Sequence, residues 1–301
     1  MKIIKQATTI PACAPSYERK RGGLAGWVKN LAVKLMRLLP TKAAQTVFLA
    51  FSGRDGDTVT VFKNVTTWRA LEVMYTYPQR KARGETNLNS RFWEAFLDNA
   101  RSIRNRLILV KTELHRVILE TADKKELIRV LSIGSGSARS VLETIATFNG
   151  SSRQIKALLI DMDASAVDFS KELARQLNIN GCATRITGNF FRLERDAAEF
   201  EPDIVELVGL LDYLTDRQVV VLLGKVRRIL APGGHLITGN ILPNPEAPFV
   251  TKGVNWPMIY RRPEELEKLL VEAGFPAHSI KTHQEPLGVH MVAIAQKLLD
   301  P

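Results

Sequence analysis

The sequence has few cysteines, no long hydrophobic run and no metal-binding pattern. Cys13 and Cys182 are its two cysteines, too few for a disulfide framework and typical of a reducing cytoplasm. It contains no run of about 18 apolar residues, which argues against a membrane-spanning helix. Its amino-terminal stretch lacks the continuous apolar segment of a signal peptide. The five histidines show no metal-ligand spacing beside acids or thiols. We therefore expect a cytoplasmic protein without a metal site.

The positive charge is concentrated in one part of the chain. The net charge is +11, and residues 1–130 hold 24 Lys and Arg against 11 Asp and Glu. Residues 131–301 hold 18 against 20. This asymmetry indicates a surface for nucleic acid, anionic lipid or an acidic substrate, or else a solvated helical face. Composition alone leaves these interpretations open.

The first part of the chain is expected to be a flexible tail, residues 1–22, followed by a mainly helical region, residues 23–124. Residues 23–40 have Trp27, Leu31 and other apolar residues at helical spacing, with lysines opposite. Such an amphipathic helix either docks on its own protein, which we favour, or makes a peripheral contact with an anionic membrane.

The next segment, residues 44–65, has two apolar runs around Gly-Arg-Asp-Gly-Asp and predicts a β-hairpin. From about residue 67 to residue 120 the periodicity is helical. Because helices that precede a sheet domain often close its ligand side, we expect residues 23–124 to be a lid or substrate region.

Strand-like and helical segments alternate after Lys124. This alternation predicts an α/β fold with a Rossmann-like, mostly parallel sheet covered on both faces. Two final strands joined by a short turn predict an antiparallel element at the sheet edge. The expected strands are residues 128–133, 156–161, 184–187, 204–208, 234–239, 278–284 and 288–297.

A glycine turn, Gly134-Ser135-Gly136, follows the first of these strands. Glycines at such a place allow a ligand to approach the backbone closely. A phosphate-binding P-loop requires Gly-Lys-Ser/Thr, which the sequence lacks, and a dinucleotide fingerprint requires a third glycine where Arg139 stands. The turn alone leaves dehydrogenases and methyltransferases open.

Three later segments indicate a nucleoside ligand. The apolar strand "ALLIDMD" ends in Asp161 and Met162, where a carboxylate can accept hydrogen bonds from ribose hydroxyls. In "RITGNFF", Asn189 can meet the adenine amino edge while Phe190 packs on the ring. Residues 201–240 predict a strand, Leu-Asp-Tyr-Leu, a helix, an Ala-Pro-Gly-Gly turn and a strand.

This order of segments strongly resembles the class I S-adenosylmethionine-dependent methyltransferases over residues 125–297. The resemblance implies that residues 125–301 bind S-adenosylmethionine, with the glycine turn beside its methionine part. The family more often has Asp at the position of Asn189, whose amide oxygen can still accept from the adenine amine. The implied cofactor-binding residues are Gly134, Ser135, Gly136, Asp161, Met162, Asn189, Phe190 and Leu210.

Longer stretches are similar to one branch of that family. They are "IRVLSIGSGSARSV", "GLLDYLTDR", "GNILPNPEAPFVTKGVNWPMIYRRPEEL" and "SIRNRLILVKTEL", and they resemble the methyltransferases of 3-hydroxy fatty acid methyl ester biosynthesis. This implies a fatty acyl carboxylate as the small-molecule acceptor. Such a group is ionised at neutral pH, so it needs a cation or donor and an apolar channel rather than a strong base. The candidates to contact it are Tyr213, Tyr260, Arg261 and Asn240, with Arg104 and Arg106.

Two alternatives remain at this stage. An RNA methyltransferase could use the basic residues 1–130 as its RNA surface, although no RNA-binding module or Asn-Pro-Pro-Tyr motif is present. A non-catalytic regulator that binds the cofactor or a lipid would also fit a chain without an obvious general base. Binding without turnover would distinguish it from an enzyme.

Overall fold

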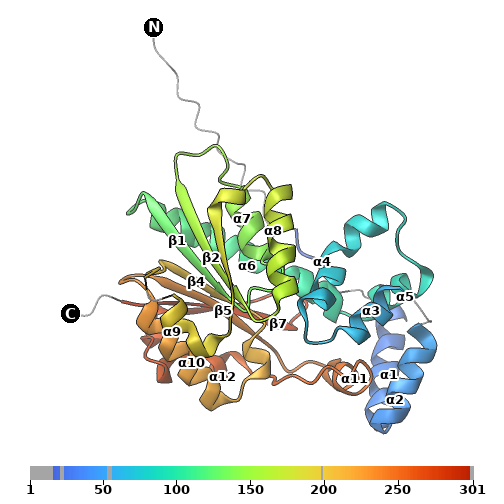
Figure 1. The fold of residues 1–301 in the computed structure, drawn as a ribbon. Helices are drawn as coiled ribbons and strands as arrows, with labels where there is room; N and C mark the ends of the chain where they lie inside the picture. The colour runs from blue at the N-terminus through green and yellow to red at the C-terminus, as the bar shows by residue number, and fades with distance from the viewer. Residues whose placement is uncertain (1–15, 21–23, 53–55, 198, 299–301) are drawn as a thin grey trace.

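A computed structural model describes residues 16–20, 24–52, 56–197 and 199–298 (Figure 1). Six helices precede the first strand, and a seven-stranded sheet with its covering helices follows. The helices that precede the sheet are α1 (Leu24–Leu38), α2 (Thr41–Ser52), α3 (Asp57–Lys63), α4 (Trp68–Ala82), α5 (Leu88–Phe96) and α6 (Asn99–Ala122).

The sheet has the order β3-β2-β1-β4-β5-β7-β6. Strands β1 to β5 are parallel, and β7 is antiparallel to both β5 and β6. The predicted Rossmann-like fold with an antiparallel edge is confirmed. The strands are β1 (Leu127–Ile133), β2 (Gln154–Asp161), β3 (Ala183–Thr187), β4 (Ile204–Leu207), β5 (His235–Ile241), β6 (Ile280–Gln284) and β7 (His290–Gln296).

Alternate residues of the strands enter two separate apolar cores, one on each face of the sheet. Leu131 and Ile133 of β1 pack on the face covered by α9, α10 and α12, whereas Ile128 and Val130 pack on the face covered by α6, α7 and α8. Helix α6 therefore belongs to the layer over the sheet, although it precedes the first strand. The covering helices are α7 (Arg139–Ala146), α8 (Ala164–Gln176), α9 (Leu193–Asp196), α10 (Asp216–Ile229) and α12 (Pro263–Glu272), while α11 (Ala247–Lys252) follows β5.

The β-hairpin predicted over residues 44–65 is wrong, because α2 and α3 occupy this segment. Ala44 and Phe48 are one helical turn apart and both are buried, and Phe48 packs against Trp93 and Phe249. Tertiary packing of this aromatic cluster thus overrides the strand propensity of the Val- and Thr-rich runs.

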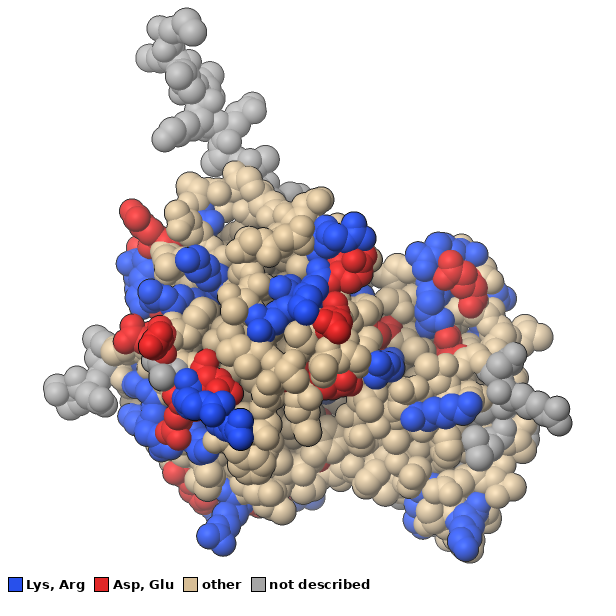
Figure 2. All heavy atoms as spheres, viewed as in Figure 1, with Lys and Arg blue, Asp and Glu red and all other residues tan. Residues whose placement is uncertain are grey.

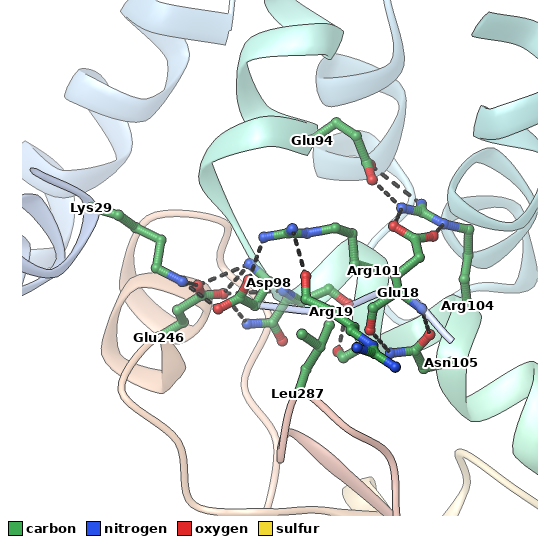
Figure 3. Close-up of polar contacts among 12 residues, drawn as sticks. Glu18, Arg19, Lys29, Glu94, Asp98, Arg101, Arg104, Asn105, Glu246 and Leu287 are labelled. Carbon is green, nitrogen blue, oxygen red and sulfur yellow. Dashed lines mark hydrogen bonds and ion pairs between the residues drawn. The ribbon is translucent and has the colours of Figure 1, made fainter. Parts of the chain in front are cut away.

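The tail predicted over residues 1–22 lies mostly outside the described residues. Its described part, residues 16–20, contacts α6: the Glu18 backbone N–H donates to Asn105 Oδ1 at 2.8 Å, and the Glu18 carboxylate pairs with Arg104 (Figure 3). This part of the segment is therefore anchored. No helix within the described ranges is long and apolar enough to cross a membrane.

A buried carboxylate joins the N-terminal helices to the loop after β5. Glu246 accepts the backbone N–H groups of Asp98 and Asn99 at 2.9 and 3.1 Å, at the amino terminus of α6 (Figure 3). Lys29 of α1 pairs with Glu246 at 2.9 Å and also with Asp98. A negative charge here satisfies free N–H groups and complements the helix dipole. Glu246 thereby ties α1 and α6 to the sheet domain.

Replacing this carboxylate tests how strongly it holds the two regions together. We expect Glu246→Ala to lower the free energy of unfolding in urea by about 2–3 kcal/mol, because charge-assisted hydrogen bonds are lost from a buried site. Glu194→Ala is the control, because its partner Arg228 is exposed and such a pair contributes about 0–1 kcal/mol. Equal losses in the two variants would contradict the assignment.

Candidate active site

A cleft of about 1080 Å³, its opening included, lies at the carboxyl ends of β1 to β4. This edge is where parallel α/β sheets bind ligands. The structure brings together here seven of the residues predicted to bind the cofactor: Gly134, Gly136, Asp161, Met162, Asn189, Phe190 and Leu210. The eighth, Ser135, lines a smaller adjoining pocket beside Arg139 and Glu206.

The glycine turn is shaped by the end of β2. Gly134 and Gly136 have φ of 63° and 53°, a left-handed conformation that glycine adopts without strain. The Gly136 N–H donates to Asp161 Oδ2 at 2.7 Å, and the Gly134 N–H donates to the Ile160 carbonyl at 2.9 Å. A Cβ on Gly136 would lie 3.2 Å from Trp68 Cβ, so a side chain there would crowd the cleft.

Asp161 has acceptor capacity left for a ligand. Its other oxygen accepts the Asp163 N–H at 2.9 Å, and an ionised carboxylate has about four lone-pair sites for its two bonds here. Asn189 has less acceptor capacity left, because its side-chain oxygen already accepts the Phe191 N–H at 3.0 Å. One lone pair of that oxygen is left for the adenine amine.

Helix α4 covers the glycine turn from the N-terminal region. Trp68 donates from Nε1 to Asp163 Oδ2 at 3.0 Å, and its ring packs on Phe169 at 4.7 Å between centroids, tilted by 40°. Trp68 and Leu71 line the cleft, although the sequence analysis did not select them. The available signal was an aromatic residue at the start of an amphipathic helix, which by itself is typical of a core position.

A second cavity of about 990 Å³ adjoins the cleft and has mostly apolar walls. Helices α3 to α6 provide one side, and Val250, Val254 and Met258 from the chain after β5 provide another. Four residues line both the cavity and the cleft: Leu71, Gly209, Tyr213 and Trp256. A ligand bound in the cleft and a ligand bound in the apolar cavity would therefore contact each other at these four residues, which we call the junction.

Arg106 is the cation beside this junction, where it lines the apolar cavity and the smaller pocket next to the glycine turn. It is buried, and its Nη1 lies 3.8 Å from Asp212 Oδ2. Gly209, which lines both spaces, has a φ of 88°, and a Cβ there would lie 3.6 Å from the same nitrogen, so the guanidinium packs directly beside this glycine. Among the described lining residues of the apolar cavity, Arg106 is the only Lys or Arg. The other acids there, Asp57 and Glu94, pair with Arg80 and Arg104.

Tyr213 also lies at the junction, as a neutral phenol. Trp256 Nε1 donates to its hydroxyl at 2.7 Å. Burial, aided by the charge of Asp212, raises the pKa of Tyr213 to about 12. At neutral pH Tyr213 can therefore hydrogen-bond a ligand or pack against it, but it does not act as a base.

The other predicted acceptor-contacting residues lie elsewhere. The Arg261 guanidinium is 2% exposed and donates to Asp216, Asn240 and the Leu211 and Leu214 carbonyls. It lines neither cavity, so its position indicates that it holds the turn that carries Tyr213. Tyr260 packs against Ile241, Leu287 and Val289 behind the wall of the apolar cavity and lines neither space.

Comparison with known proteins identifies the family. Residues 38–297 match the model of a family described as "Putative methyltransferase". The chain belongs to this methyltransferase family. A ribosomal protein L11 methyltransferase from Geobacter sp. (strain M21) is 30% identical over 138 residues, which are 46% of this chain and 40% of that relative. The chain thus spans less than half of that relative's length.

Solved structures share the fold at low identity. A "possible exported protein" from Bordetella parapertussis has a TM-score of 0.62 at 18% identity, over 90% of this chain and 97% of that one. The magnesium protoporphyrin IX methyltransferase from Synechocystis PCC 6803 has a TM-score of 0.52 at 13% identity, over 80% and 99%. These similarities show the methyltransferase fold.

Asp161 offers a test of the cleft as the cofactor site. We expect Asp161→Ala to weaken binding of S-adenosylhomocysteine by more than about tenfold, because a carboxylate that accepts from ribose and from the glycine turn is lost. Calorimetric titration measures this effect, with exposed Asp168→Ala as the control. Wild-type affinity in Asp161→Ala, with the fold intact by circular dichroism, would reject the assignment.

Proposed function

We propose that this methyltransferase transfers the methyl group of S-adenosylmethionine to the carboxylate of a fatty acid, including 3-hydroxy fatty acids, to give a methyl ester. The observation that carries the proposal is Arg106, a buried cation where a cofactor cleft meets an apolar cavity. The resemblance of the longer sequence stretches to fatty acid methyl ester enzymes supports the same acceptor.

The lining of the cleft fits a nucleoside without phosphate. Asp161 and Asp163 line it, and neither Lys nor Arg is among its described lining residues. A dinucleotide or nucleotide would bring phosphates that such a surface does not neutralise, whereas a sulfonium nucleoside carries positive charge. S-adenosylmethionine is therefore the donor that best matches both the charge and the fold.

The apolar cavity fits the tail and head of a fatty acid. Its apolar walls would bury the acyl chain at about 25 cal/mol per Å² of apolar surface. A guanidinium has five N–H donors in a planar fork. Tyr75 accepts from this fork, and the long 3.8 Å contact with Asp212 leaves further donors for a carboxylate. The carboxylate would lie beside Gly209, at the opening to the cleft.

The chemistry needs alignment rather than a base. Bound S-adenosylmethionine would supply an electrophilic methyl group on a sulfonium sulfur. A carboxylate oxygen would bond to the methyl carbon in line with the carbon–sulfur bond, which breaks and leaves S-adenosylhomocysteine. No proton moves, since the acid is already ionised at neutral pH. Arg106 orients the carboxylate, while Leu71 and Trp256 narrow the junction and exclude water. A neutral Tyr213 is compatible with this reaction.

The alternatives are not favoured. Part of the basic excess of the N-terminal half is internal, because Arg101, Arg104 and Arg106 are buried. On the face in Figure 2, basic and acidic side chains are interspersed rather than gathered into one basic surface. Membership of a methyltransferase family argues against a regulator without activity.

We also propose that α1 makes a peripheral membrane contact that brings the acceptor to the protein. Val33 is buried on one side of this helix, whereas Trp27, Leu31, Leu35 and Leu38 are exposed along the other. Exposed Lys34 and Lys42 would favour an anionic surface. Phe48 of the adjoining α2 lines the apolar cavity, so this surface lies near the acceptor's site.

Vesicle flotation tests the membrane contact. We expect Leu35→Glu to reduce binding to phosphatidylglycerol vesicles by about fivefold or more, since it places a negative charge on the exposed apolar face that would enter the membrane interface. The matched control is Val221→Glu on α10, because Val221 and Leu35 are 55% and 56% exposed. Equal binding of both variants, or no binding by the wild type, would contradict the proposal.

The acceptor itself is tested with methyl-labelled S-adenosylmethionine and fatty acids. We expect an organic-extractable product whose label is released by mild alkali, and a KM for the acid that rises about tenfold or more in Arg106→Lys, which keeps the charge but loses the planar fork. Affinity for S-adenosylhomocysteine should not change. Label that enters RNA or protein instead would overturn the fatty acid assignment.

A further inference from the structure

His290 lines the same apolar cavity as Arg106. His290 begins β7 and pairs with Ile241 at the end of β5. Because β7 is antiparallel to β5, its first residue lies at the same edge of the sheet as the cofactor cleft. The side chain is 3% exposed, and within the described part of the chain neither ring nitrogen has a hydrogen-bond partner.

A buried histidine ring without hydrogen bonds destabilises the folded protein unless a ligand supplies a hydrogen-bond partner. A buried donor or acceptor without a partner costs about 1–3 kcal/mol. Burial and the nearby charge of Arg106 lower the pKa of His290 well below its usual value, so the ring is neutral at physiological pH. A neutral imidazole has one N–H donor and one acceptor nitrogen.

The surrounding structure fixes His290 relative to Arg106. The Glu285 carboxylate accepts the Val289 N–H at 2.7 Å and the Leu287 N–H at 2.8 Å, which holds the turn before β7. It also accepts the His290 backbone N–H at 3.3 Å and a hydrogen bond from Asn105 Nδ2 at 3.0 Å, and Asn105 precedes Arg106 on α6. One buried carboxylate therefore links the helix that carries the guanidinium to the hairpin that carries the imidazole.

We infer that His290 is a specificity-determining residue that hydrogen-bonds a hydroxyl of the acceptor while Arg106 holds its carboxylate. This inference rests on the proposed function. A carboxylate has no hydrogen to donate and would satisfy only the N–H of the ring. A hydroxyl both donates and accepts, so it matches either nitrogen of a neutral imidazole. The acceptor class is therefore an apolar hydroxy acid rather than an unsubstituted one.

The test compares a 3-hydroxy fatty acid with the unsubstituted acid of the same length, in the wild type, His290→Leu and His290→Gln. We expect the wild type to prefer the hydroxy acid by about tenfold or more in kcat/KM, since a site built for a hydroxyl rejects the analogue that lacks it. His290→Leu should lose this preference through a lower kcat/KM for the hydroxy acid alone. His290→Gln, which keeps a donor and an acceptor, should recover part of it.

Calorimetric binding of both acids in the presence of S-adenosylhomocysteine separates this inference from the proposed function. A preference for the hydroxy acid that His290→Leu removes, without methylation of either acid, would support the inference on binding and overturn the ester assignment. Methylation of both acids without preference, or equal losses for both in His290→Leu, would overturn the inference and leave the ester assignment standing. Failure of both acids to bind would overturn both.

Discussion

The burial of α6 between the sheet and the N-terminal helices is the constraint on which the rest of the structure depends. Its carboxyl-terminal half supplies Leu109, Leu114 and Ile118 to the core on one face of the sheet. Its amino-terminal half is polar yet buried, with Arg101, Arg104 and Arg106 in adjacent turns. Buried charges require partners, and these arginines have them both at the start of α6, where Asp98 pairs with Arg101, and in other segments, where Glu18 and Glu94 pair with Arg104.

Carboxylates from several segments of the chain hold α6 in place. Glu246 after β5 caps α6, and Glu18 and Glu94 pair with Arg104 (Figure 3). Glu285 accepts a hydrogen bond from Asn105. The helix is thereby held at both the loop after β5 and the turn before β7. Arg106 consequently lies in the wall of the apolar cavity, beside Gly209, which also lines the cleft. One packed helix thus fixes a buried cation between the sheet and the N-terminal helices.

Much of the sheet domain could be predicted from the sequence, because its signals are local. Apolar runs that alternate with helical segments predict the strands, and the Ala-Pro-Gly-Gly turn, Gly134 and Asp161 fall at strand ends whichever helices cover them. The sequence also indicated α1 as an amphipathic helix. It could not show that the broader apolar side, with Trp27 and Leu35, faces outward, because that depends on which neighbour α1 meets.

The features that sequence reasoning missed depend on contacts between distant segments. Residues 44–65 have strand-like composition, yet packing with Trp93 and Phe249 makes them helical. The sequence favoured Arg261 over Arg106 as a residue that contacts the acceptor, and only the contacts of Arg261 with carbonyls and Asp216 show that it holds a turn instead. His290 has no neighbouring sequence motif, since its significance comes from two ring nitrogens that meet no partner across the cavity.

The most direct test of this account is a crystal structure with S-adenosylhomocysteine and a long-chain fatty acid bound together. The account predicts the nucleoside across Asp161, the acyl chain between α3–α6 and the chain after β5, and the carboxylate within hydrogen-bond distance of Arg106, facing the sulfur. An acyl chain bound elsewhere, or a carboxylate turned away from the sulfur with Arg106 unliganded, would contradict it.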